Sequence, residues 1–194
     1  MPTHRKQDII LAGVGGQGIL SIAFVIDNAA LREGYNVKQA EVHGMAQRGG
    51  AVQSHLRFST DRIHSDLIPK GEADLILSIE PLEALRYLDY LRPGGRVVSS
   101  RTPFINIPDY PDLDTILAGI RAVEGSLILD SEALAKEAGT SKAQNTVMLG
   151  AAAKYLAVPE EGLLEFIKIL FGPRGDKLLN ANLRAFELGR KAAG

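Results

Sequence analysis

Short apolar runs alternate along the chain with longer stretches in which apolar residues recur every three or four positions. A short apolar run is typical of a buried strand, and the longer period is typical of a helix that packs by one face. The run at 9–12 is followed by such a helical stripe over 18–33, and Gly34 then fits a helix C-terminal cap. The pattern predicts an α/β fold: a three-layer, Rossmann-like mixed sheet with helices on both faces and a helical C-terminal third.

The same periodicities give approximate bounds for each element. Strands are expected at 8–12, 35–42, 52–58, 74–78, 96–100 and 126–130. Helices are expected at 18–33, 81–91, 115–123, 131–138, 144–156, 160–170 and 176–190. The sequence Pro93-Gly94-Gly95 predicts a turn, and a short extended piece is expected near Ile63.

The connection between the second and third expected strands decides the kind of sheet. Only residues 43–50 stand between them, whereas a parallel crossover usually needs about a dozen residues or more. The third strand is therefore expected to run antiparallel to the second. Because no repeat or low-complexity linker interrupts the pattern, residues 1–194 are expected to form a single domain.

A glycine cluster follows the first expected strand at once: Gly13-Val14-Gly15-Gly16-Gln17-Gly18. This spacing is typical of a strand that turns into a helix whose first N–H groups face a phosphate. We expect Gly13 to make the tight turn, Gly15 to let the backbone approach a phosphate, and Gly18 to allow close helix–sheet packing. Gly16 adds freedom for an anion-binding nest. A turn without a ligand and an NAD site are alternatives, the second weakened because the nearest acidic residue, Glu41, comes late for a ribose contact.

A second glycine-flanked segment follows the second expected strand: His43-Gly44-Met45-Ala46-Gln47-Arg48-Gly49-Gly50. If the first two strands are parallel neighbours, both segments lie at the carboxyl edge of the sheet, where open α/β folds bind ligands. The Arg48 guanidinium then suits a phosphate or a carboxylate, and Gln47 adds amide hydrogen bonds. Gly49 and Gly50 leave the backbone accessible. A subunit contact is one alternative, and an Arg48 that pairs with a nearby acid while the glycines only shape a turn is another.

Composition removes several kinds of chemistry. A net charge of -1 provides no broad field for nucleic acid or an anionic membrane, and neither partner is expected. The absence of cysteine excludes disulfides, cysteine-ligated iron–sulfur clusters and a cysteine nucleophile within the chain. The histidines lack metal-ligand spacing, so no metal site is expected. The apolar stretch 9–26 is interrupted by glycines, which disfavours a membrane span, and we expect a cytoplasmic protein.

No constellation typical of a self-sufficient enzyme stands out. The serines lack the context of a nucleophile elbow, and the phosphate-binding loop of nucleoside triphosphatases is absent. Most acidic residues fall on predicted helix surfaces, so no pair for acid–base work is evident. We therefore expect a binding crevice in this chain and no catalytic residue.

The two glycine segments together resemble the gamma-type subunit or domain of 2-oxoacid:ferredoxin oxidoreductases, most closely the indolepyruvate type. His43 and Met45 favour that branch. The resemblance covers nearly the whole chain and continues through three further stretches: Glu80-Pro81-Leu82-Glu83-Ala84 with Arg92-Pro93-Gly94-Gly95, Lys142-Ala143-Gln144-Asn145-Thr146-Val147-Met148-Leu149-Gly150-Ala151, and Asn182-Leu183-Arg184-Ala185-Phe186-Glu187-Leu188-Gly189. The segment from His43 to Gly50 is far more specific than the first glycine loop.

The resemblance implies a role in a multisubunit enzyme that oxidatively decarboxylates a 2-oxoacid, joins the acyl group to coenzyme A and passes electrons to ferredoxin. Thiamine diphosphate and iron–sulfur clusters are then expected in partner subunits, with ferredoxin an indirect partner. This chain would contribute assembly and the coenzyme A side of the crevice. The residues carried over as phosphate or interface contacts are Gly13, Gly15, Gly16, Gln17, Gly18, Arg48, Gly49 and Gly50.

Several questions stay open at this point. The 2-oxoacid, the stoichiometry and the formation of a homodimer are undecided. Asn145 either begins a helix or makes a buried contact to a partner, and the role of His43 is unassigned. A stand-alone NAD- or FAD-dependent oxidoreductase and a non-catalytic nucleotide-binding regulator are the competing functions.

Overall fold

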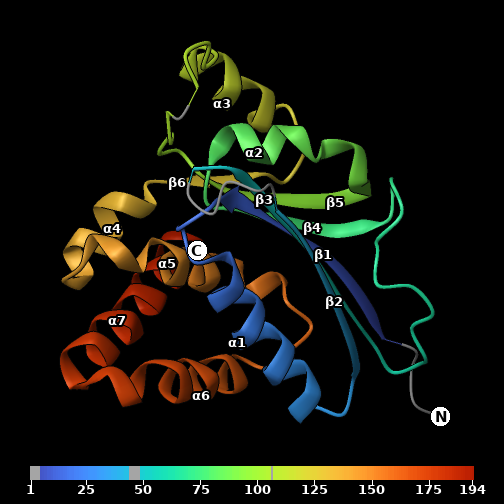
Figure 1. Ribbon diagram of the computed structural model, residues 1–194, viewed down its shortest axis with the longest axis vertical. Helices are drawn as coiled ribbons and strands as arrows, with labels where there is room; N and C mark the ends of the chain where they lie inside the picture. The colour runs from blue at the N-terminus through green and yellow to red at the C-terminus, as the bar shows by residue number, and fades with distance from the viewer. Residues whose placement is uncertain (1–4, 44–48, 106) are drawn as a thin grey trace.

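Six strands form one mixed sheet in the computed structural model, which describes residues 5–43, 49–105 and 107–194. Figure 1 shows this sheet edge-on between two groups of helices. The strand order across the sheet is β2-β3-β1-β4-β5-β6. The strands are β1 (Lys6–Val14), β2 (Asn36–His43), β3 (Ala51–Ser59), β4 (Ala73–Ser78), β5 (Leu91–Ser100) and β6 (Leu127–Leu129).

Strand β3 is the one that makes the sheet mixed. It pairs antiparallel with β2 on one side and with β1 on the other, whereas β1, β4, β5 and β6 pair parallel to one another. The expected antiparallel third strand is confirmed. The condition that the first two strands are neighbours is wrong, because β3 lies between them. Strands β1 and β2 still point the same way, so their carboxyl ends reach the same edge of the sheet.

The helices cover both faces of the sheet (Figure 1). Helices α2 (Pro81–Arg86) and α3 (Leu113–Arg121) pack on one face around Ile10, Ile76 and Val97. The other face buries Ile9, Leu11 and Leu75 under the remaining helices: α1 (Ile19–Arg32), α4 (Ser131–Ala138), α5 (Gln144–Ala152), α6 (Glu160–Phe171) and α7 (Asp176–Ala192). Because β1 is apolar toward both faces, it is buried along almost its full length, as a central strand must be. The three-layer expectation is confirmed.

Three local expectations are wrong. The helix expected over 81–91 ends at Arg86, because the chain must turn at Tyr87 to let Leu91 pair beside Ala73 on β4. The Pro93-Gly94-Gly95 turn lies instead inside β5, where the register with β4 shifts between Ala73 and Leu75. Gly94 has a φ of 74°, so the sequence that predicts a turn produces an irregularity within a strand. Around Ile63 the chain forms no strand.

Candidate functional site

The first glycine segment forms a tight turn from β1 into α1 at the carboxyl edge of the sheet. Gln17 closes this turn twice: its N–H donates to the Val14 carbonyl at 3.0 Å, and its side-chain Oε1 accepts the Val14 N–H at 2.8 Å. Gly18 then caps α1 in the left-handed conformation, with a φ of 81°. Among the described residues no side chain caps the first turn of α1, and that turn contains no acidic residue. This end of the helix is therefore favourable for an anion.

The glycines of this segment have different structural roles. Gly13 does not make the turn; it is still within β1, opposite Val52. A Cβ on Gly13 would come within 2.8 Å of both the Gln17 side chain and Ile19, so glycine is needed there for packing. Gly16 has a φ of 101°, and a Cβ there would meet no atom within 4 Å. Gly16 is therefore the position where the turn exposes its backbone.

Gly18 packs against a helix and not against the sheet, which corrects the expected helix–sheet contact. A Cβ on Gly18 would lie 2.5 Å from Nδ2 of Asn145, and that amide donates to the Gly18 carbonyl at 3.3 Å. Asn145 is the second residue of α5 and is buried, and its Oδ1 accepts the Thr146 N–H. Thr146 in turn contacts Asn182 of α7. The Asn145 side chain therefore links the turn to the C-terminal helices within this chain.

The second glycine segment meets the first through backbone hydrogen bonds. The Gly15 N–H donates to the Gly50 carbonyl at 2.8 Å, and the Gly49 N–H donates to the Gly15 carbonyl at 3.3 Å. Gly49 has a φ of 76°, and a Cβ there would meet no described atom within 4 Å. Residues 44–48, which include Gln47 and Arg48, lie outside the described residues, as does the side chain of His43. Gly15, Gly49 and Gly50 are thus brought together, and the predicted contacts of Gln47 and Arg48 stay predictions.

A buried carboxylate was missed at the carboxyl end of β4. Glu80 is buried and caps α2, accepting the Glu83 N–H at 2.9 Å. It also accepts the Phe104 N–H at 3.2 Å and the Tyr110 hydroxyl. The Glu-Pro-x-Glu sequence at the end of an apolar strand resembles a helix-capping pattern and could have revealed it. Through these hydrogen bonds, Glu80 connects the loop after β5 to the start of α2.

Glu83, also buried, is a second acid that the sequence placed on a helix surface. Burial is the main cause that raises the pKa of Glu83 to about 7; the Arg86 guanidinium, 3.1 Å away, opposes this rise, and the nearby Glu80 adds to it. A carboxyl group with such a pKa exchanges its proton near neutrality. The charged groups beside Glu83 are Arg86 and Glu80, which the structure explains as helix packing and capping, so we assign Glu83 no chemical role.

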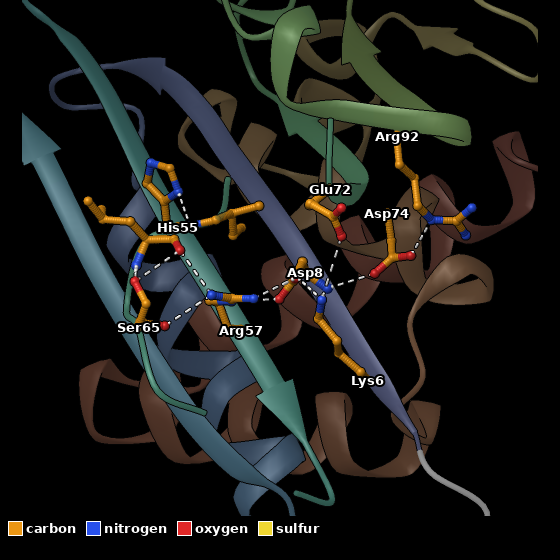
Figure 2. Close-up of polar contacts among 10 residues, drawn as sticks. Lys6, Asp8, His55, Arg57, Ser65, Glu72, Asp74 and Arg92 are labelled. Carbon is orange, nitrogen blue, oxygen red and sulfur yellow. Dashed lines mark hydrogen bonds and ion pairs between the residues drawn. The ribbon is translucent and has the colours of Figure 1, made fainter. Parts of the chain in front are cut away.

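The opposite end of β1 carries a different polar cluster, shown in Figure 2. Asp8 is fully buried, and the Arg57 guanidinium on β3 donates two hydrogen bonds of 2.8 and 3.0 Å to its carboxylate. Lys6 lies 2.8 Å from the same carboxylate. The Asp8 N–H donates to Asp74, which also receives the Arg92 guanidinium at 2.6 Å. These charges satisfy one another, as is typical of a structural ion network.

His55 lies beside this network and is neutral. Its Nδ1 accepts the Ile68 N–H at 3.1 Å, which places the ring proton on Nε2. Burial, and next the Arg57 guanidinium, lower the pKa of His55 below its ordinary value, while Asp8 acts in the opposite direction. In the described ranges, no group of three or more His, Asp or Glu side chains is arranged to hold a metal ion.

None of the helices in the described part of the chain is long and apolar enough to cross a membrane. The segment 9–26 that suggested such a span is divided between the buried strand β1, the glycine turn and helix α1. Its apolar residues belong to the core on one face or the other of the sheet.

Comparison with known proteins gives relatives along the whole chain. The family described as pyruvate ferredoxin/flavodoxin oxidoreductase matches residues 8–192. The chain is 42% identical over 199 residues to indolepyruvate oxidoreductase subunit IorB of Thermococcus kodakarensis, covering 97% of this chain and 96% of that one. It is 28% identical to ketoisovalerate oxidoreductase subunit VorA of Methanothermobacter marburgensis, but there it covers only 37% of the relative.

Solved structures agree. The 2-oxoglutarate:ferredoxin oxidoreductase from Magnetococcus marinus, solved with 2-oxoglutarate, coenzyme A and succinyl-CoA bound, matches with a TM-score of 0.77 and 25% identity, over 97% of this chain and 31% of that chain. The pyruvate oxidoreductase subunit PORC from Thermotoga maritima shares the fold, with a TM-score of 0.73 and 22% identity over 96% of both chains. The resemblance given by the two glycine segments is confirmed, and the chain belongs to the pyruvate ferredoxin/flavodoxin oxidoreductase family.

Proposed function

We propose that this chain is the gamma-type subunit of an indolepyruvate-type 2-oxoacid:ferredoxin oxidoreductase, acting as a single cytoplasmic domain over residues 1–194. Its partner subunit carries thiamine diphosphate and iron–sulfur clusters and passes electrons to ferredoxin. The identity of 42% to an indolepyruvate oxidoreductase subunit, over nearly the full length of both chains, supports the indolepyruvate assignment. The chain itself contains no cysteine for a cluster, in agreement with clusters held elsewhere.

The observation that carries the proposed site is the backbone contact between the two glycine segments. Through the hydrogen bonds of Gly15 with Gly49 and Gly50, two open-backbone turns become one surface at the carboxyl edge of the sheet. Gly16 and Gly49 both have positive φ and open space where a side chain would be. Together with the uncapped start of α1, this surface fits the phosphates of coenzyme A.

When bound, coenzyme A supplies the thiol that accepts the acyl group. The residues of this chain bind and orient the cofactor, and they perform no covalent step. Gly15, Gly16, Gly18, Gly49 and Gly50 shape the backbone, Gly13 and Gln17 hold the turn closed, and the guanidinium of Arg48 provides the positive charge for a phosphate. The same surface is where a partner subunit completes the crevice.

The arrangement of the strands speaks against a stand-alone NAD-dependent enzyme. A dinucleotide fold needs its acidic ribose contact on the strand next to β1. Glu41 is on β2, paired with Ser54 of β3, so a whole strand separates it from β1. A regulator that binds nucleotides without an enzyme partner lacks support from any specific contact.

Reconstitution with the native partner tests the proposal. The chain is co-expressed with the thiamine- and cluster-bearing subunit of its own host, and coenzyme A binding to the purified complex is measured by calorimetry. We expect Arg48→Ala to weaken coenzyme A binding roughly 10- to 100-fold, the range for loss of a charge-assisted hydrogen bond. Arg62→Ala is the matched control, because Arg62 is an exposed arginine after β3, at the other end of the sheet.

Failure of the chain to co-purify with such a subunit contradicts the proposed enzyme. Co-purification combined with unchanged coenzyme A affinity and assembly in Arg48→Ala contradicts the proposed site. Tight NAD(H) binding by the isolated chain favours the stand-alone oxidoreductase instead.

A further inference from the structure

The loop that follows β5 exposes three large apolar side chains within a short stretch. Phe104 is 42% exposed, Ile105 72% and Ile107 38%. Single exposed apolar residues are ordinary on protein surfaces. Three in one loop are the kind of feature that marks an interaction site.

This loop is held firmly at its base. The buried carboxylate of Glu80 accepts the Phe104 N–H, and the Tyr110 hydroxyl bonds to the same carboxylate oxygen. At the start of the loop, the Thr102 N–H donates to the Ser100 hydroxyl at 3.0 Å. Burying a carboxylate is costly unless it is hydrogen-bonded, and two of the groups that bond Glu80 belong to this loop. A surface fixed before binding loses less entropy when a partner docks.

Two arginines lie beside the apolar loop. Arg101 immediately precedes it, and Arg121 ends α3. Both line a cleft of about 430 Å³ along edge strand β6. Within the residues that the structure describes, neither guanidinium has a hydrogen-bond or ion-pair partner. Asp130, the acid in this cleft, already accepts the Ala133 N–H at 2.9 Å as the cap of α4. The cleft therefore favours acidic groups.

The free edge of β6 adds backbone hydrogen-bonding groups. The Leu129 carbonyl accepts the Arg101 N–H, so Leu129 faces β5. Because successive residues of a strand point their backbone groups to opposite sides, Ile128 directs its N–H and carbonyl away from the sheet. Exposed edges of this kind are usually covered in native proteins.

Two relatives contain the same unit within a longer chain. This chain matches only 37% of the ketoisovalerate oxidoreductase subunit and 31% of the Magnetococcus chain. In those proteins the same unit is continuous with a much longer polypeptide, whereas the indolepyruvate-type relative is matched over 96% of its length. In the complex proposed above, this unit is instead held by contact between separate chains.

We propose that Phe104, Ile105 and Ile107, together with Arg101 and Arg121, form the surface on which the partner subunit docks. The complementary segment of the partner presents apolar side chains to the loop and acidic side chains to the cleft. Glu80 acts as a positioning residue for the loop. This inference rests on the proposed function, since it assumes that a partner subunit exists.

Assembly of the native complex tests the inference. The affinity of the chain for its partner subunit is measured by analytical ultracentrifugation for wild type, Ile105→Ser and Arg101→Glu. We expect each substitution to weaken assembly at least tenfold, as is common at the centre of an interface. Leu67→Ser is the matched control, because Leu67 is 52% exposed on a loop elsewhere and should leave assembly unchanged. All these side chains are exposed, so thermal melting should stay near wild type.

Glu80→Gln adds a readout of positioning. We expect faster amide hydrogen exchange at Phe104 together with weaker assembly, whereas Ile105→Ser should weaken assembly without changing that exchange.

Each outcome has a distinct meaning. Wild-type chain that does not bind the partner overturns the proposed function itself. Wild type that assembles while Ile105→Ser and Arg101→Glu assemble equally well overturns the docking surface alone. Loss of a homodimer in Ile105→Ser with partner binding intact also overturns it, in favour of a second copy. Inorganic phosphate is also titrated into wild type and Arg101→Glu. If only wild type binds phosphate while both proteins assemble equally well, the arginine cleft binds a small anion, and the docking surface is overturned too.

Discussion

The two ends of strand β1 differ in how they use polar groups. At its start, Asp8 is buried and held by Arg57 and Lys6, and each charge has a partner from the chain itself (Figure 2). At its end, Gly16 and Gly49 lie in positive-φ turns where a Cβ would meet no described atom within 4 Å. One end of the strand is closed on itself, and the other is where we propose that a ligand binds.

This difference shows why a dense polar cluster is a poor guide to function here. The Asp8–Arg57 pair contains the more conspicuous charges, but its bidentate geometry consumes the groups that a substrate would need. In the glycine turns, the N–H groups of Gly15, Gln17 and Gly49 close the turns, which leaves the N–H groups at the start of α1 for the proposed anion. The proposed function thus separates stability and recognition along a single buried strand.

The largest effect is expected from breaking the closed end. Asp8→Ala leaves the Arg57 guanidinium buried without its counter-charge, which typically costs about 3–5 kcal/mol of unfolding free energy. Urea denaturation followed by circular dichroism measures this loss. Asp89→Ala is the control, since the Lys70–Asp89 pair is exposed and should matter little. Equal losses in the two variants contradict a structural role for the buried network.

A smaller loss is expected within the glycine turn. Alanine is strained at a positive φ by about 1 kcal/mol, a cost shared by Gly16→Ala and Gly18→Ala. Gly18→Ala also drives a Cβ to 2.5 Å from the Asn145 amide, so its total cost should be about 2–3 kcal/mol. Chemical denaturation of both variants measures the difference.

A double-mutant cycle isolates the contact with Asn145. If the amide is the obstacle, Gly18→Ala combined with Asn145→Ala should destabilise less than the sum of the two single variants. Additive losses point to backbone strain alone as the cost at Gly18.

Local sequence signals predicted the elements near the site well. The apolar run at 9–12 and the glycine spacing correctly predicted a strand, a turn and helix α1, because each depends on neighbours in sequence. The short connection at 43–50 also correctly predicted an antiparallel β3, since chain length alone limits the crossover. The meeting of Gly15 with Gly49 and Gly50 follows from that topology.

The remainder depends on contacts that no local pattern contains. Placement of β3 between β1 and β2 is a pairing choice between distant strands, and it puts a whole strand between Glu41 and β1. The buried role of Glu80 was not predicted, because its partners Phe104 and Tyr110 are more than twenty residues away in sequence. Asp8 meets Arg57 through the β1–β3 register alone.

The smallest effect concerns pH at the closed end. Burial and Arg57 lower the pKa of His55 in the native state below the 6.5 of an unfolded chain. The unfolded state therefore binds more protons as the pH falls below about 6.5, and this contribution to stability, present above that pH, is lost on acidification. His55→Asn keeps an acceptor for the Ile68 N–H but cannot be protonated.

We expect the stability of wild type relative to His55→Asn to decline between pH 7 and pH 5. Urea midpoints of the two proteins at both pH values measure this, because other titrating groups are common to both and cancel. A constant difference across that range means that His55 titrates alike in the folded and unfolded chains, and that the neutral ring is not maintained by its burial beside Arg57. A decline in the predicted direction means that His55, like Asp8, is held in a fixed charge state by groups of the chain itself.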